Sequence, residues 1–298
     1  MFSQRTIKEK VSFEGIGLHS GESVSMVLSP APPDTGVVFS LNGVIIRASH
    51  ENVGDTSYAT TLQKDGASIR TVEHLMAALA GLMVDNVYVD ITGPEVPIMD
   101  GSAWPFVKAL KTAGIAEQEA SRRYLKIVKP VTVKDGDKSA SLLPSPVPRV
   151  TYRIDFDHPL ISGQDYSIDL DAEGFSENLA SARTFGFLKD EEMLRKAGLA
   201  KGASLNNAVV VDDSGVLNEG GLRYKDEFVR HKILDAVGDL SLIGMPIIGH
   251  FVADKSGHML NQRLIREVLS RPDCWVVLDG GQACESAPLS LTMTEAIP

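Results

Sequence analysis

The chain has 298 residues, of which 43% are hydrophobic and 23% charged, an ordinary composition for a globular protein. Its formal net charge of −10 argues against a general binder of nucleic-acid backbones, although a small anionic ligand needs only a local cluster of donors. No apolar run reaches the ~18 residues that a membrane span requires, and the N-terminal MFSQRTIKEK lacks the apolar core of a signal peptide. Two cysteines, Cys274 and Cys284, are too few for a disulfide framework, so we expect a reduced, cytoplasmic protein.

The first part of the chain predicts strands followed by two helices. Residues 1–60 are rich in strand patterns, with turns at GIGLHSG and APPDTG. The spacing of apolar residues then predicts a helix over about 71–82, with Thr71 as its N-cap. NVYVDI is a short strand, GPEVPIMDGS is a loop, and a second helix over about 103–114 ends at Gly114.

The second part repeats this order after the polar run EQEASRR, 117–123, which is the best candidate for a linker. Strand patterns follow at YLKIVKPVTV, KSASLLP and RVTYRIDF, and the mixed stretch 178–200 includes a short helix. AVVVDD is a strand, a long helix begins near Lys225, IIGHFVA is a strand, and LNQRLIREVLS is the last helix. The sequence therefore predicts an α+β protein with a first domain over 1–120 and a second over 124–298.

A short and weak sequence pattern recurs in the two parts, and we call it the local echo. Val72-x-His74 is followed by Gly81, and Val229-x-His231 is followed by Gly238 at equal spacing. Each of these helices leads into a strand. The echo favours two similar domains, although a coincidence would produce the same pattern.

The stretch VRHKILDAVGDL aligns three polar residues on one stripe of its helix, because His231, Asp235 and Asp239 follow each other at four-residue spacing. Apolar side chains occupy the opposite face. An isolated stripe of this kind is more often a solvated face with a weak ion pair. A His and an Asp one turn apart can also converge on one ion, but a catalytic zinc typically takes a third protein ligand.

His74 is the candidate for that third ligand. It points away from the apolar face of its helix and lies in the first turn, where the helix dipole disfavours a protonated imidazole. A solvent-exposed histidine is the alternative. Glu73 stands beside it, where a general base for a water at the metal would lie, and it would equally stabilise the helix start as a first-turn acid. The pattern alone does not show that His74 and His231 meet.

Six motifs, running in order from about residue 3 to about residue 270, closely resemble one family: GIGLHSG, TVEHLMAALAG, PIMDGSA, SARTFGF, VLNEGGLRYKDEFVRHKILDAVGDL and KSGHMLNQ. This is the zinc-dependent UDP-3-O-acyl-N-acetylglucosamine deacetylase family of lipid A biosynthesis in Gram-negative bacteria. The resemblance implies hydrolysis of the N-acetyl group of UDP-3-O-(3-hydroxyacyl)-N-acetylglucosamine, releasing acetate, as the committed step. It also implies two similar α+β domains, each a sheet packed on two helices, in a β-α-α-β sandwich with the site at their interface.

The resemblance assigns roles to individual residues. It implies that His74, His231 and Asp235 hold one Zn²⁺ ion, a ligand set that Fe²⁺ would also suit, and that Glu73 is the general base. His258 resembles the cation that stabilises the oxyanion or protonates the leaving amine.

Further positions match by the same resemblance. Asp239 resembles the carboxylate that orients and charges His258, and Thr184 resembles a hydroxyl that holds the oxyanion. Substrate contacts are implied for Lys232, Phe185 and Leu18. The stretch 185–211 lies where the family carries an insert that forms an acyl groove, whereas His19 receives no role.

Two other hypotheses are alternatives to the deacetylase. A non-catalytic, metal-dependent binder of an acylated nucleotide sugar would need neither a base nor an oxyanion donor, so Glu73 and Thr184 argue against it. A purely structural zinc site is usually closed by Cys and His ligands, and both cysteines lie outside the motifs. We expect a monomer with a small-molecule substrate and no nucleic-acid partner. The acyl-chain preference stays open.

Overall fold

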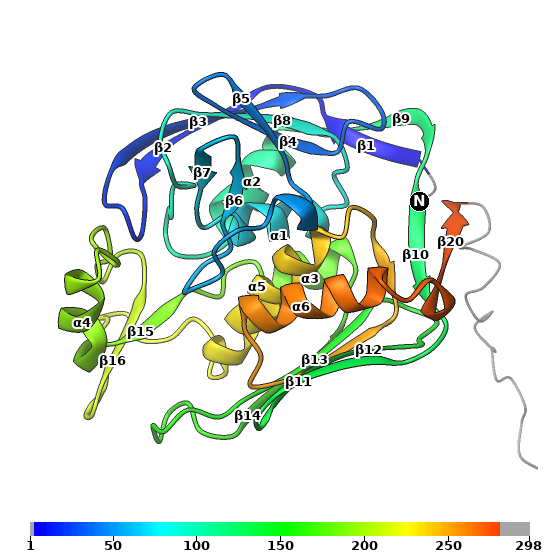
Figure 1. Ribbon diagram of the computed structural model, residues 1–298. Coiled ribbons are helices and arrows are strands. Elements are labelled where there is room, and N and C mark those ends of the chain that lie inside the picture. Colours follow the sequence, from blue (N-terminus) through cyan, green and yellow to red (C-terminus); the bar gives the residue numbers. More distant parts are fainter. Residues whose placement is uncertain (1–2, 281–298) are drawn as a thin grey trace, which may run out of the picture.

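The computed structural model describes residues 3–280 and contains two five-stranded sheets with helices between them (Figure 1). In the first sheet the strand order is β2-β3-β8-β4-β5, and only β4 and β8 run parallel. Its strands alternate buried and exposed residues, as β8 shows, because one face packs on the helices. The bounds are β2 Val11–Ile16, β3 Ser23–Pro30, β4 Val37–Leu41, β5 Val44–Arg47 and β8 Val87–Ile91.

The second sheet repeats this topology in the order β11-β12-β19-β13-β14, and only β13 and β19 run parallel. In both sheets the last strand along the chain inserts between the second and the third. The expected α+β fold built from two similar halves is therefore confirmed. The bounds are β11 Val131–Asp135, β12 Lys138–Leu143, β13 Arg149–Ile154, β14 Gln164–Asp169 and β19 His250–Asp254.

Two helices accompany each sheet in the layer between the sheets (Figure 1). α1 (Glu73–Gly81) and α2 (Trp104–Ala113) belong to the first half, and α5 (Glu227–Ser241) and α6 (His258–Leu269) belong to the second. A shorter helix, α3 (Ala172–Asn178), precedes an excursion that lies at one side of the molecule (Figure 1). This excursion contains β15 Phe185–Phe187, η2 Leu188–Asp190, α4 Glu191–Lys196, β16 Val209–Asp212 and β17 Gly215–Val216.

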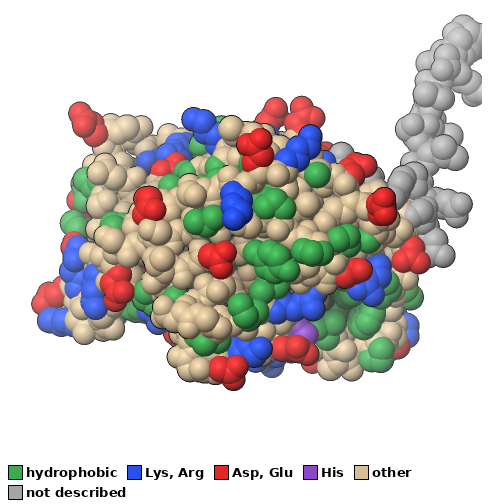
Figure 2. All heavy atoms as spheres, turned by 90° about the horizontal axis from the view of Figure 1, so that it is seen from above, with side chains coloured by type: hydrophobic (Ala, Val, Ile, Leu, Met, Phe, Trp, Pro, Cys, Tyr) green, Lys and Arg blue, Asp and Glu red, His purple; other side chains and the backbone are tan. Residues whose placement is uncertain are grey.

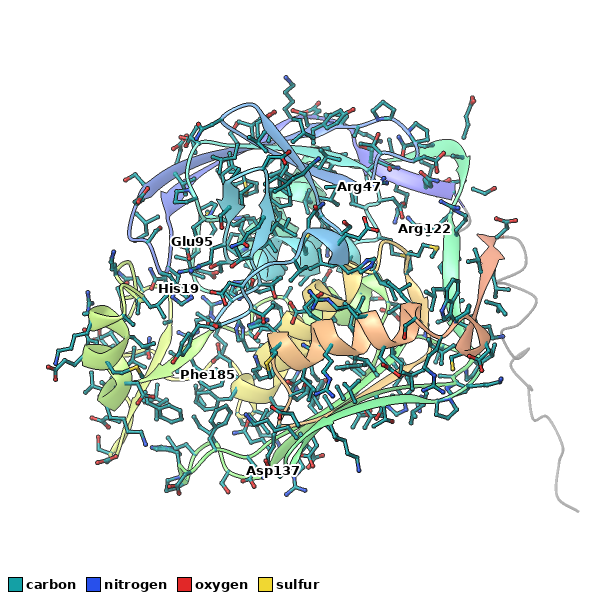
Figure 3. All side chains as sticks on the ribbon, in the orientation of Figure 1. His19, Arg47, Glu95, Arg122, Asp137 and Phe185 are labelled. Carbon is teal, nitrogen blue, oxygen red and sulfur yellow. The ribbon has the colours of Figure 1, made fainter. Side chains whose placement is uncertain are left out.

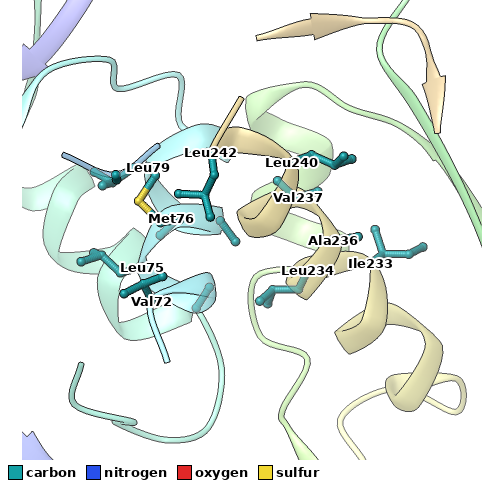
Figure 4. Packing of buried hydrophobic residues seen from close by; sticks show 14 of the residues in the cluster. Val72, Leu75, Met76, Leu79, Ile233, Leu234, Ala236, Val237, Leu240 and Leu242 are labelled. Carbon is teal, nitrogen blue, oxygen red and sulfur yellow. The ribbon is translucent and has the colours of Figure 1, made fainter. Parts of the chain in front are cut away.

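α1 and α5 pack directly on each other across the middle layer. Apolar residues of both helices fill their shared interface, among them Leu75 and Met76 of α1 and Leu234 of α5 (Figure 4). The helices also approach closely at Gly238, where a Cβ would lie 2.0 Å from the carbonyl oxygen of Glu73. A glycine is required at that position because any side chain would force the two helices apart.

Two local predictions are wrong. Thr71 is not the N-cap of α1: its backbone has φ +58°, and its hydroxyl donates to Glu95 instead of to the helix. The run 117–123 is not an irregular linker, because most of it forms β9 (Ile115–Ser121), which pairs antiparallel with β1 (Ser3–Ile7). Arg122 is buried and donates to Asp85, which ties this connection to the first half.

The other short elements lie outside the two five-stranded sheets. They are η1 His50–Asn52, β6 Leu62–Lys64, β7 Ala67–Ile69, β10 Arg123–Ile127, β18 Ile247–Ile248, η3 Pro272–Cys274 and β20 Trp275–Asp279. Cys274 is buried and free, and Cys284 lies outside the described residues, as does the end of the expected second domain. Within residues 3–280, no helix combines the length and the apolar character needed to cross a membrane. Acidic and basic side chains are interspersed over the described part of the face shown in Figure 2.

Candidate active site

His74, His231 and Asp235 converge at the interface between α1 and α5. The Oδ1 atom of Asp235 lies 3.5 Å from Nε2 of His74 and 3.3 Å from Nε2 of His231. The three candidate ligand atoms lie within 4.8 Å of one another, and all three residues are buried. The polar stripe of α5 is therefore not a solvated face, and His74 is not exposed to solvent.

Hydrogen bonds at the far side of His231 and Asp235 leave the converging atoms of these two residues available. Nδ1 of His231 donates to the carbonyl oxygen of Ala182 at 3.1 Å, which directs Nε2 toward Asp235. Oδ2 of Asp235 accepts from Nζ of Lys232 at 2.7 Å, whereas its buried Oδ1 receives no hydrogen bond from the described residues. A buried carboxylate oxygen between two imidazole nitrogens is a position that a divalent cation would satisfy.

The electrostatic environment favours the metal-binding protonation states. Burial lowers the pKa of His231 to about 4 despite the opposing charge of Asp235, so its imidazole is neutral at neutral pH. Burial alone would raise the pKa of Asp235, but His231 and Lys232 outweigh it and hold that pKa well below its usual range. Two imidazoles and one carboxylate form a donor set that fits zinc and leaves room for further ligands.

A second group of polar residues adjoins this cluster. Oε1 of the buried Glu73 lies 3.9 Å from Nε2 of His258, the first residue of α6. Oε2 of Glu73 accepts a hydrogen bond from the backbone N–H of Thr60 at 3.0 Å. Burial raises the pKa of Glu73, although the neighbouring His258 and His74 oppose that change. A carboxylate with a raised pKa is suited to accept a proton near neutral pH.

Asp239 lies behind His258 and is fully buried. Its Oδ2 accepts from Nδ1 of His258 and from Nδ2 of Asn261, each at 2.9 Å, and its Oδ1 accepts from the hydroxyl of Thr60. Burial lowers the pKa of His258, but the charge and hydrogen bond of Asp239, together with Glu73, outweigh it and raise the pKa to about 9. His258 is therefore a cation at neutral pH.

The SARTFGF segment lies along α5 because Arg183 forms a buried two-pronged ion pair with Glu227, at 2.8 and 3.0 Å. Phe185 follows, and its ring centroid lies 6.3 Å from that of His231 and 5.0 Å from that of Phe228. The backbone of Thr184 is held between Gly101 and Val209. Both Thr184 and Phe185 are half-buried, and the ring of Phe185 lies beside His231.

Leu18 lies farther out, in the GIGLHSG turn. Its carbonyl oxygen accepts from the backbone N–H of Gly202, and that of His19 accepts from Lys201. This turn therefore contacts the 185–211 stretch directly. His19 is buried, and burial lowers its pKa against the opposing charge of Glu95. Lys232 contacts Asp235 rather than open solvent.

Several residues of the site were not predicted from the sequence. Thr60 bridges Glu73 and Asp239, Asn261 shares Asp239 with His258, and Arg183 holds the segment that carries Thr184. Thr60 lies in an irregular stretch between β5 and β6, where no periodicity indicates which way its side chain points. Only the fold reveals these contacts.

Comparison with known proteins gives one consistent answer. Residues 4–270 match the family described as UDP-3-O-acyl N-acetylglycosamine deacetylase. The chain belongs to this family. The UDP-3-O-acyl-N-acetylglucosamine deacetylase of Myxococcus xanthus is 53% identical over 281 residues, covering 93% of this chain and 90% of the relative. Those of Hahella chejuensis and Pseudomonas entomophila are 52% and 50% identical over 296 residues, with 97% of this chain covered and 98% and 97% of the relatives.

Membership of the deacetylase family establishes the class of reaction. The chain is a UDP-3-O-acyl-N-acetylglucosamine deacetylase of lipid A biosynthesis, a hydrolase that acts on an amide of a small-molecule substrate. The family is a metalloenzyme family, and among residues 3–280 the candidate ligand group is His74, His231 and Asp235.

Proposed function

We propose that this chain uses a single Zn²⁺ ion, held by His74, His231 and Asp235, to release acetate from UDP-3-O-(3-hydroxyacyl)-N-acetylglucosamine. The convergence of these three buried side chains across the α1–α5 interface is the observation that carries the proposal. A zinc ion in such a site lowers the pKa of a bound water toward ~7 and polarises a carbonyl. Fe²⁺ would suit the same donors, so the choice of zinc is part of the proposal.

Glu73 is the general base of the proposed reaction. Its raised pKa lets it take a proton from the attacking water, and the N–H of Thr60 fixes its other oxygen. As the water oxygen bonds to the acetamide carbon, the carbonyl oxygen gains negative charge. We assign the stabilisation of that charge to the hydroxyl of Thr184 and to the cationic His258.

His258 completes the reaction as the general acid. The amine is a poor leaving group until its nitrogen is protonated, and His258 is charged at neutral pH because Asp239 holds the proton on its ring. Transfer of the Nε2 proton to the nitrogen breaks the C–N bond and yields acetate and the free amino sugar. Asp239 acts through His258 and does not contact the substrate.

The remaining proposed roles concern binding. Phe185, beside His231, would form a wall next to the sugar, and Lys232 would contribute a positive charge toward the substrate. Leu18 and the insert 185–211, whose backbones are hydrogen-bonded, would border the acyl chain. We further propose that the enzyme works as a cytoplasmic monomer, with one domain over 1–120 and the other over 124–298.

The test is product analysis with purified, zinc-loaded enzyme. UDP-3-O-acyl-N-acetylglucosamine should give acetate and free amine in equal amounts, whereas UDP-N-acetylglucosamine without the acyl chain should react far more slowly. Tight binding of the acylated substrate without any acetate release would contradict the proposal and favour the non-catalytic binder.

A further inference from the structure

Glu95 is a buried carboxylate of the first half of the molecule and is not among the residues assigned above. It lies in the loop after β8 and is 1% exposed. Its Oε1 accepts from the backbone N–H of His19 at 2.9 Å and from the hydroxyl of Thr71 at 2.7 Å. Its Oε2 accepts from the N–H of Ser20 at 2.7 Å. A carboxyl group buried in this way requires such donors, so its position is strongly constrained.

The bonds from the backbone N–H groups of His19 and Ser20 fix the GIGLHSG turn. The backbone wraps so closely around the carboxylate that a Cβ on Gly17 would lie 2.3 Å from Oε2 of Glu95. On its other side the same turn accepts hydrogen bonds from the insert, at 3.0 Å from Gly202 to Leu18 and at 3.2 Å from Lys201 to His19. Glu95 and His19 lie together on the side of the molecule that carries α4 (Figure 3). Glu95 is therefore linked to the insert through one turn.

The bond to Thr71 fixes the start of α1. Thr71 has φ +58°, a conformation that is strained for a β-branched residue and persists only where contacts hold it. The helix begins two residues later at Glu73. The backbone of the preceding residue, Arg70, is also paired with the Glu95 loop, because it donates to Pro94 and accepts from Val96. The direction in which Glu73 and His74 leave this turn thus depends on the hydroxyl that Glu95 holds.

We propose that Glu95 is a positioning residue for the deacetylation, which joins the start of α1 to the GIGLHSG turn and, through that turn, to the acyl-binding insert. The inference rests on the proposed function, since it assigns Glu95 an effect on both Glu73 and the acyl groove. It predicts two separable defects: a lower kcat through Thr71 and a higher KM through the turn.

The experiment compares Glu95→Gln, Thr71→Val, Thr71→Ser and wild type in kcat and KM, with a long-acyl and a short-acyl substrate. A glutamine places an N–H₂ group against backbone donors, so it should raise KM for the long-acyl substrate by about tenfold and affect the short one much less. Thr71→Val should lower kcat by about tenfold with little change in KM, and Thr71→Ser should restore it. Glu14→Gln is the matched control, because that carboxylate of the same half is exposed and accepts a hydrogen bond from the hydroxyl of Ser25, so the substitution should leave both constants unchanged.

Each outcome decides the inference. A folded Glu95→Gln enzyme with unchanged constants, or with the same rise in KM for the long-acyl and the short-acyl substrate, would overturn it. If Glu95→Gln does not fold, the Thr71 pair decides, since wild-type kcat in Thr71→Val would overturn the proposed link to α1. A wild-type enzyme that releases no acetate would instead contradict the proposed function, which separates the two failures.

Discussion

Replacement of Asp239 by asparagine isolates the charge that keeps His258 protonated. The substitution keeps the shape of the side chain, but it removes the negative charge that Asp239 places 2.9 Å from Nδ1 of His258. With Asp239 the pKa of His258 is about 9, against an ordinary value of 6.5. Once Asp239 is neutralised, burial lowers this pKa more than Glu73 raises it, so His258 in the variant should have a pKa at or below about 6.5, a change worth at least ~3 kcal/mol.

The pH dependence follows from the sign of this change. In wild type the rate should rise with pH as Glu73 loses its proton and fall as pH rises through about 9, where His258 loses its proton. At pH 7.5 a pKa of 9 leaves about 97% of His258 protonated, whereas a pKa of 6.5 leaves about 9%. Asp239→Asn should therefore lower kcat/KM at least about tenfold at pH 7.5 and move the falling limb to about pH 6.5 or below.

The assay is acetate release from pH 5.5 to 10, with zinc content measured on the same samples. Asp239 lies outside the group of three converging ligand atoms, so the variant should retain its zinc, as should Asp239→Ala, which should also lose most of the rate. A falling limb that stays near pH 9 in Asp239→Asn would refute the proposed role of His258. Loss of zinc would instead place Asp239 among the ligands.

Three further predictions test other parts of the site. Glu73→Gln should keep the hydrogen bond from Thr60 and bind zinc, yet lose roughly 10²–10⁴-fold in kcat; normal activity would exclude Glu73 as the base. Gly238→Ala should destabilise the fold by about 1–3 kcal/mol in denaturant titration, because its Cβ meets the backbone of α1, whereas Gly220→Ala has open space and should be neutral. Removal of the metal by a chelator should lower Tm, and zinc at a hundredfold excess over its Kd should restore about 2.7 kcal/mol of the free energy of unfolding. A Tm that does not change would argue against a zinc site in the folded core.

The sequence predicts those parts of the site that depend on local periodicity. The i, i+4 spacing of His231, Asp235 and Asp239 places them on one stripe of α5, and the end of α2 at Gly114 follows from its positive φ. The pairing of His74 with His231 could not be derived from spacing, because it depends on the packing of two helices from different halves. Gly238 permits the close approach of α5 to α1. Gly238 belongs to the short pattern that recurs in both halves, but the sequence did not show that this glycine lies at a helix contact.

The wrong predictions have physical causes. Threonine is a common N-cap, but the backbone before α1 turns through a left-handed residue, and Glu95, distant in sequence, attracts the hydroxyl of Thr71. β9 has a polar composition typical of a linker because it pairs with β1 in a two-stranded sheet and none of its residues is buried. No sequence pattern indicated a role for Thr60, because its contacts with Glu73 and Asp239 form only where α1 and α5 meet.

The most direct test of the central claim is a zinc titration of the metal-free enzyme, with acetate release from UDP-3-O-acyl-N-acetylglucosamine as the readout. If His74, His231 and Asp235 hold the single catalytic ion, activity should rise from near zero in proportion to added zinc and level off at one equivalent per chain. Full activity in the metal-free protein, or no activity at any zinc concentration, would contradict the account.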